Sequence, residues 1–198
     1  MISNRIKLSC VLLLSLLALP GLADSANNYQ RSIENYQIPD VTLTNHLGNQ
    51  VKLVELLDQD KPVLVEFIYA TCTTICPILS AGYSNLQRKL GERSEDVRLL
   101  SISIDPEHDN PEVMSNYLKR YRGKPGWEFL TGSRDNIDSV MHAFDAYVSN
   151  KMSHYPLTLI KVPEKNQWVR LYGLVGTSEL TREIERLYGP VITAEGQK

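Results

Sequence analysis

Two cysteines four positions apart, Cys72 and Cys76, place the strongest constraint on what this chain can be. Residues 62–69 before them are mostly apolar and of strand length, which is typical of a buried strand. Pro77 directly follows the second cysteine, and proline is favoured in the first turn of a helix. The pair therefore occupies a loop between a strand and a helix, where two thiols can either cycle to a disulfide or bind a soft metal ion.

The first 23 residues have the features of a secretory signal. Arg5 and Lys7 give a basic start, residues 10–19 are apolar, and the small residue Ala23 fits the position before a cleavage point. The apolar run has about ten residues, whereas a helix needs roughly 20 to span a bilayer, so we favour cleavage after Ala23 over an uncleaved membrane anchor. Export predicts a periplasmic protein, in an oxidising compartment where disulfides persist.

Removal of residues 1–23 leaves roughly 175 residues, which suits one domain with its own hydrophobic core. We expect a loose leader over residues 24–36, one domain over residues 37–190 and a flexible tail over residues 191–198. The formal net charge is −2, and the sequence has no basic stripe of the kind that binds nucleic acid. A nucleic-acid partner is therefore not expected.

Alternating strand and helix patterns predict a mixed α/β domain. Central strands are expected at residues 62–69, 97–104 and 127–130. Antiparallel hairpins are expected from residues 41–45 with 50–54, followed by a short helical turn at 52–57, and from residues 155–162 with 168–172. Helices are expected at residues 77–91, 111–121, 133–148 and 177–188, with Asn110 and Ser133 as N-caps of the second and third. This order predicts a thioredoxin-like sandwich with an added N-terminal β-hairpin, and it places the thiols at the end of the first central strand.

His154 is the histidine that we favour as a partner of the thiols. It precedes the expected strand 155–162, and in thioredoxin-like folds the loop before that strand lies against the cysteine loop. A thiol near a helix N-terminus is pushed toward thiolate, and two thiolates make a soft site suited to Cu(I) that one imidazole would complete. His108 is a weaker candidate, and His46 and His142 are expected to have ordinary surface roles.

Each of these residues also has a simpler explanation. Cys72 and Cys76 could form a plain structural disulfide, and His154 could be a structural histidine. Asp105 follows a strand but precedes a proline, so we favour ordinary turn chemistry for it. Glu66 interrupts an apolar strand, where it would either face solvent at a sheet edge or pair with a basic side chain.

Four segments, in order, resemble the Sco/SenC family of copper chaperones. They are Phe67–Pro77, similar to the family's CxxxCP site; Ser101–Glu112, similar to its SIDPExDxPE stretch; Trp127–Gly132, similar to its WxFLTG strand; and His154 before a strand, in register with its metal-binding histidine. The similarity extends over residues 38–188. It implies a thioredoxin-like fold that binds copper, as Cu(I) or Cu(II), through Cys72, Cys76 and His154.

The resemblance also implies a role in respiratory assembly, in which the protein delivers copper to, or reduces the cysteines of, the CuA site in subunit II of cytochrome c oxidase. The implied partners are that subunit or another cuproprotein, together with a thiol reductant. Such a carrier need not be an enzyme.

The alternative is a periplasmic thiol–disulfide oxidoreductase, which would use Cys72 and Cys76 for redox chemistry and would not need His154. A peroxide-reducing enzyme of related fold is less favoured. Motifs for dinucleotide binding, phosphoryl transfer, zinc proteolysis and serine hydrolysis are absent from the sequence.

Overall fold

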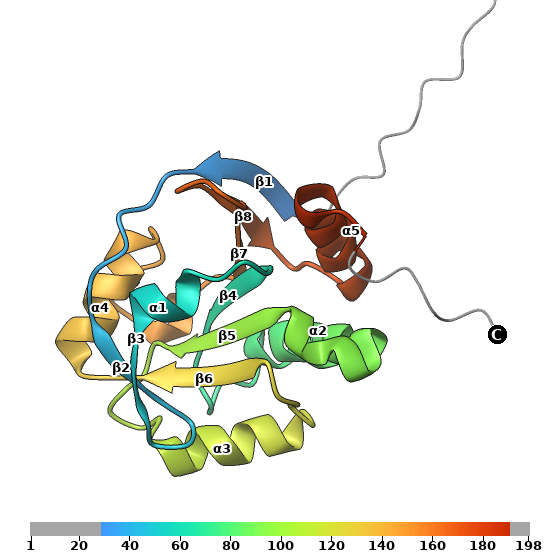
Figure 1. Ribbon diagram of the computed structural model, residues 1–198. Coiled ribbons are helices and arrows are strands. Elements are labelled where there is room, and N and C mark those ends of the chain that lie inside the picture. Colours follow the sequence, from blue (N-terminus) through green and yellow to red (C-terminus); the bar gives the residue numbers. More distant parts are fainter. Residues whose placement is uncertain (1–28, 191–198) are drawn as a thin grey trace, which may run out of the picture.

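The framework of the protein is a mixed sheet of eight strands, seen in a computed structural model that describes residues 29–190. The strand order is β1-β8-β7-β4-β5-β6-β2-β3 (Figure 1). The strands are β1 Tyr29–Glu34, β2 Thr42–Asn45, β3 Gln50–Lys52, β4 Val63–Ile68, β5 Arg98–Ser103, β6 Trp127–Thr131, β7 Leu157–Lys161 and β8 Trp168–Gly173. The α-helices are α1 Leu53–Leu57, α2 Cys76–Leu90, α3 Pro111–Arg120, α4 Arg134–Ala143 and α5 Thr177–Tyr188, and short 3-10 helices are η1 Gly91–Asp96 and η2 Lys151–Ser153.

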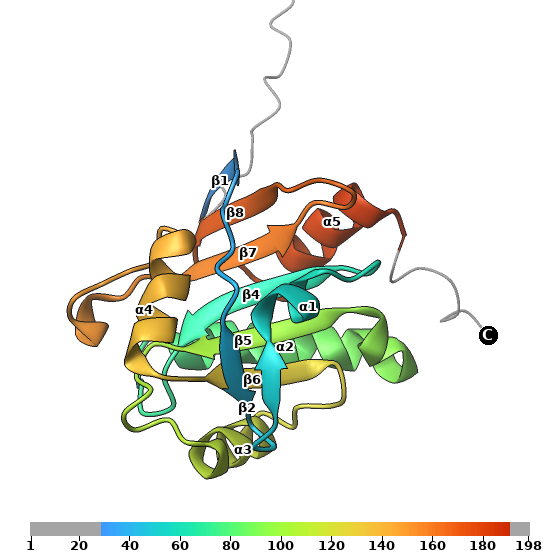
Figure 2. The same ribbon diagram turned by 60° about the vertical axis from the view of Figure 1, so that its left-hand side comes forward.

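Strand β4 lies in the middle of the sheet and carries the cysteine loop at its end. It pairs in parallel with β5 and antiparallel with β7, and all of its residues are buried. Successive strand residues point to opposite faces: Glu66 points to Ser80 of α2, whereas Phe67 points to Phe144, directly after α4. Helices α2 and α4 therefore cover opposite faces of the sheet (Figure 2), and α5 packs beside α2. Coverage on both faces explains why β4 is apolar at every position except Glu66.

Both predicted hairpins are confirmed. Strands β2 and β3 pair antiparallel at one edge of the sheet, and β2 also pairs with β6. Gly48 takes the turn between them at φ +84°, a conformation that glycine adopts without steric cost. The Asn45 side-chain oxygen accepts two backbone hydrogen bonds from the same turn. Strands β7 and β8 form the second hairpin.

The expectation of a loose leader over residues 24–36 is wrong for its second half. Residues 29–34 form β1, which pairs antiparallel with β8 from Tyr29 opposite Gly173 to Glu34 opposite Trp168. The strand lies at the sheet edge and its middle residues are exposed, so its sequence carries no buried apolar period. Main-chain hydrogen bonds hold this strand, and these leave little trace in a polar sequence.

The helix N-caps are confirmed, but one helix is shorter than expected. The Asn110 side chain accepts from the backbone N–H of Val113, and the Ser133 hydroxyl accepts from that of Asn136. Helix α4 ends at Ala143 rather than near residue 148, because the chain turns back through Asp145 at φ +50°. The residues after that turn contain η2, a short helix that the sequence patterns did not predict.

The predicted signal segment, residues 1–23, and the predicted tail, residues 191–198, lie outside the described residues. Within residues 29–190, no helix combines the length and the apolar character needed to cross a membrane.

Candidate metal centre

The cysteine loop is a tight connection between β4 and α2. After β4 ends, the backbone N–H of Cys72 donates to the carbonyl of Tyr69, at 3.1 Å, which closes a turn. Helix α2 then begins at Cys76, with Pro77 in its first turn as predicted. Cys72 is 6% exposed and Cys76 is fully buried. Both thiols are free, so the pair is not joined as a structural disulfide here.

The loop before β7 brings His154 to these two sulfurs. Strand β7 pairs directly with β4, so the residues that precede β7 lie beside the residues that follow β4. His154 Nε2 is 3.1 Å from Cys76 Sγ and 4.0 Å from Cys72 Sγ. The three donor atoms all lie within 4.8 Å of one another. The fold therefore joins the three residues that the sequence singled out.

A backbone contact fixes which nitrogen of His154 faces the sulfurs. His154 Nδ1 lies 2.7 Å from the carbonyl oxygen of Lys151. Because a carbonyl can only accept, Nδ1 carries the proton and Nε2 keeps its lone pair. A second hydrogen bond of this kind is how proteins usually orient a metal-binding imidazole.

The two thiols have different acidities. Burial raises the pKa of Cys72, but hydrogen bonds from the Cys76 thiol and from Thr74 outweigh burial, so this pKa lies below its ordinary value. Burial, followed by the neighbouring Cys72 sulfur, raises the pKa of Cys76 well above its ordinary value. Burial also lowers the pKa of His154, which keeps the imidazole neutral near pH 7. Helix α2 begins at Cys76, yet the more acidic thiol is Cys72, which precedes the helix.

The donor set and its spacing fit a metal ion. An ion about 2.0 to 2.3 Å from two sulfurs and one nitrogen requires donor–donor separations of about 3 to 4.5 Å, close to the separations given above. Two thiolates and an imidazole suit Cu(I), Cu(II) or Zn²⁺ rather than Mg²⁺ or Ca²⁺, which prefer oxygen ligands. The same arrangement also permits thiol–disulfide exchange, because the sulfurs are adjacent and free.

The other three histidines do not join this cluster. His108 Nδ1 contacts the Asp105 carboxylate, and its side chain is 67% exposed. His46 is half-buried and accepts a long hydrogen bond from a backbone N–H of β6, whereas His142 stacks on Tyr147 at the surface. His142 thus has the surface role that we expected, whereas His46 is partly buried against β6.

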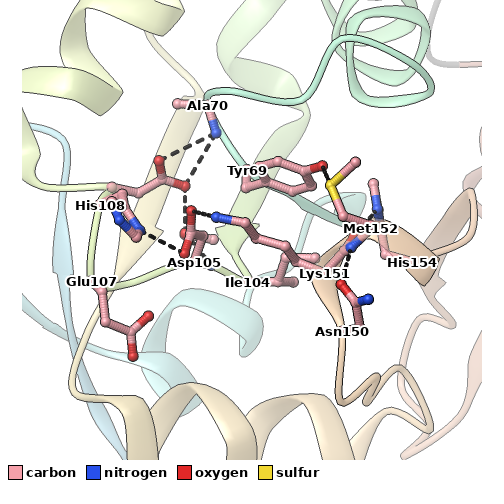
Figure 3. Close-up of polar contacts among 12 residues, drawn as sticks. Tyr69, Ala70, Ile104, Asp105, Glu107, His108, Asn150, Lys151, Met152 and His154 are labelled. Atoms are coloured by element: carbon pink, nitrogen blue, oxygen red, sulfur yellow. Dashed lines mark hydrogen bonds and ion pairs between the residues drawn. The ribbon is translucent and has the colours of Figure 1, made fainter.

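Around the three donors lies a group of side chains that the sequence patterns did not connect with the site. The Tyr69 hydroxyl donates a hydrogen bond to the Met152 sulfur, and the Tyr69 and His154 rings pack in a T-shaped arrangement. Asp105 is 4% exposed and forms an ion pair with Lys151, three residues before His154 (Figure 3). The only sequence signal for this group is that Asp105 and Asp109 both lie in the turn after β5. That signal does not distinguish the segment from an ordinary turn.

Both expectations for Glu66 are wrong. Its side chain is fully buried and neither faces solvent nor forms an ion pair within residues 29–190. It accepts hydrogen bonds from Ser101 at 2.7 Å and Ser80 at 3.5 Å, while its Oε2 finds no partner among the described residues. Burial raises the pKa of Glu66 to about 8, so the carboxyl is largely protonated at pH 7.

A sandwich of this topology, with two thiols and an imidazole converging at the end of its central strand, defines a thioredoxin-like protein with a candidate thiolate–imidazole metal centre. The chain belongs to the SCO1/SenC family, whose model matches residues 31–187.

Relatives and solved structures agree with this assignment. The chain is 36% identical to the SCO1 protein homolog of Bacillus subtilis over 117 residues, which are 58% of this chain and 60% of that protein. It is 34% identical to protein SenC of Rhodobacter capsulatus over 100 residues, which are 50% and 44% of the two chains. The matches thus span less than two thirds of these relatives.

Two solved structures share the fold of this chain over a larger part of its length than the sequence matches cover. A Bradyrhizobium japonicum ScoI structure with copper bound has a TM-score of 0.62 and 27% identity, covering 76% of this chain and 99% of that one. BsSco, described as a Sco cytochrome c oxidase assembly protein with a disulfide switch, has a TM-score of 0.63 and 27% identity, covering 81% and 96%. The thioredoxin-like fold predicted from the sequence is confirmed.

Proposed function

We propose that this protein is an exported copper carrier for the assembly of a copper-containing oxidase. Cys72, Cys76 and His154 hold the copper, and the protein passes it to the CuA site of cytochrome c oxidase subunit II or to another cuproprotein. The observation that carries the proposal is the convergence of two sulfurs and one imidazole nitrogen within 4.8 Å. Copper in the ScoI relative and the oxidase-assembly role given for BsSco support the choice of metal and partner.

The differing thiols suit a carrier that must release its cargo. Cys72 is the more acidic and the more exposed sulfur, so it is the natural first point of exchange with an incoming thiolate of a partner. Cys76 is fully buried, and together with His154 it holds the ion until that exchange has begun. Binding at Cys76 displaces a proton, because a thiolate is the metal-binding form.

Thiol–disulfide exchange is the second candidate function, favoured by the same asymmetry. The Cys72 thiolate would attack a partner disulfide and form a mixed disulfide with release of one partner thiolate. Cys76 would then lose its proton, attack Cys72 and release the second partner thiolate, which leaves Cys72–Cys76 oxidised and the partner reduced. A periplasmic thiol reductant must then restore the dithiol.

Copper titration of the reduced protein tests the first function. Competition with a chromogenic Cu(I) chelator should give tight binding of one ion, and Cys72→Ser, Cys76→Ser and His154→Ala should each weaken it. His108→Ala is the matched control, because His108 is an exposed histidine outside the cluster. Wild-type affinity in the first three variants would show that the assigned donors are wrong.

Oxidase assembly in cells separates the two functions. His154→Ala removes the imidazole donor and leaves both thiols for redox exchange. Loss of CuA formation in this variant supports copper delivery, whereas full assembly with His154→Ala but none with Cys72→Ser supports thiol reduction.

A further inference from the structure

The turn between β5 and α3 contacts both halves of the candidate metal centre. Asp109 is fully buried and accepts the backbone N–H of Ala70, at 3.2 Å and 3.3 Å from its two oxygens, within the cysteine loop. It also accepts from the Ser103 hydroxyl at 2.6 Å. Asp105 accepts a hydrogen bond from Lys151, which lies in the loop before β7 that carries His154, here called the histidine loop (Figure 3). A backbone bond of 3.0 Å from Asp109 N–H to the Asp105 carbonyl ties the two aspartates together.

The side chain of Lys151 contacts Asp105, and its backbone contacts His154. Its carbonyl oxygen accepts the His154 Nδ1 proton, and it also accepts the backbone N–H of His154 at 3.3 Å. Its ammonium lies 5.3 Å from the centre of the Tyr69 ring, which packs against the His154 ring in a T-shaped arrangement. The lysine thus joins Asp105 through its side chain and His154 through its backbone.

Apart from the hydrogen bond that Met152 accepts from Tyr69, the histidine loop has few other means of support. Helix η2 is only three residues long and contains no buried residue. Short helices are marginal without tertiary packing, and here Asn150 caps the turn from within the loop itself. Asp105, whose side chain is 5% exposed, needs a cationic partner because an unpaired buried carboxylate is costly. The ion pair therefore satisfies a buried charge, alongside the His108 contact, and it is a second tie on this loop besides the hydrogen bond from Tyr69 to Met152.

We propose that the Asp105–Lys151 ion pair positions His154, and that the turn spanning residues 105–109 thereby sets the spacing between the imidazole and the two sulfurs. Neither residue touches the metal. The inference deepens the proposed copper function and rests on it for its relevance, but the positioning itself is a property of the metal-free protein. Removing the pair should free the Nδ1 hydrogen bond and let the imidazole turn.

The first test reads the imidazole without any metal. In ¹⁵N-labelled, reduced protein, long-range ¹H–¹⁵N spectra should show one Nδ1–H tautomer for His154. Lys151→Met, which keeps an unbranched stem against Tyr69, should shift the signals toward a mixture of tautomers, and Lys151→Arg should retain the wild-type pattern. Lys161→Met is the matched control, because Lys161 is a part-buried lysine that pairs with Asp58 at the opposite end of β7.

The second test reads copper. The dissociation constant for Cu(I) should rise about tenfold or more in Lys151→Met, as is typical when an outer partner of a metal-binding histidine is lost, and should stay unchanged in Lys161→Met. Asp105→Asn removes the same ion pair from the other side, so it replaces Lys151→Met if that variant does not fold. An unchanged tautomer and an unchanged affinity in the ion-pair variants would overturn the positioning role. A wild-type protein that shows the single tautomer but binds no copper would instead overturn the copper function alone.

Discussion

Replacement of Glu66 by glutamine should stabilise the protein at alkaline pH, by an amount that the burial of this carboxyl predicts. The pKa of Glu66 is about 8 in the folded protein and 4.5 when unperturbed. The folded state therefore keeps a proton that the unfolded state loses between these two values. Stability is unaffected below about pH 4.5 and falls as pH rises toward 8. At roughly 1.4 kcal/mol for each pKa unit, the full loss is about 5 kcal/mol.

Glutamine keeps the shape of the side chain and its acceptor for Ser101 but cannot ionise. The free energy of unfolding, measured by urea titration of the reduced protein with tryptophan fluorescence, should fall with pH in the wild type relative to Glu66→Gln. The difference between the two proteins should grow by about 5 kcal/mol from pH 4.5 to pH 8. Asp58→Asn is a control at a carboxyl whose side chain is 92% exposed. Parallel wild-type and Glu66→Gln curves over this range would refute the claim that the carboxyl is protonated when folded.

Three further predictions concern the site and the scaffold. Copper affinity should rise with pH through the neutral range by up to about tenfold per unit, because binding displaces the proton of Cys76, whose pKa is raised by burial; a pH-independent dissociation constant would contradict this. Gly126→Ala should destabilise the protein by about 2 to 3 kcal/mol in urea unfolding, because φ is +93° and the new Cβ would meet the Ser94 carbonyl at 2.8 Å. Gly48→Ala should lower the free energy of unfolding by only about 1 kcal/mol, because φ is +84° but the space around the glycine is open. Asn110→Ala should cost about 1 kcal/mol through loss of its N-cap, measured by thermal unfolding.

The parts of the site that could be predicted from the sequence are those that local rules determine. The buried run before Cys72 and the proline after Cys76 mark a strand, a loop and a helix start, and each signal lies within a few residues of the others. The placement of His154 needed the fold as well, because the antiparallel pairing of β7 with β4 joins positions about eighty residues apart.

What could not be predicted depends on contacts between distant residues or on main-chain pairing. The ion pair of Asp105 with Lys151 joins two loops separated by 46 positions, and neither loop has a periodic pattern. Glu66 is polar in a fully buried strand. The two serines that donate hydrogen bonds to its carboxyl belong to two other elements, α2 and β5. Strand β1 is exposed on its middle residues, so its place depends on the backbone edge of β8 and on the ion pair of Arg31 with Glu183 of α5, which are both distant in the sequence.

The pairing of β1 with β8 decides where a tether can be attached without obstructing the candidate metal centre. Tyr29 lies opposite Gly173, whose N–H bonds to the carbonyl of Pro156, two residues after His154. With strands spaced about 4.8 Å apart, anything fused ahead of Tyr29 starts within roughly 15 Å of the imidazole. Helix α5 ends instead at Tyr188, whose hydroxyl bonds to the carbonyl of Lys161 at the far end of β7. Surface immobilisation through the carboxyl end therefore leaves the edge that carries Cys72 and His154 open to solvent, whereas immobilisation through the amino end crowds it.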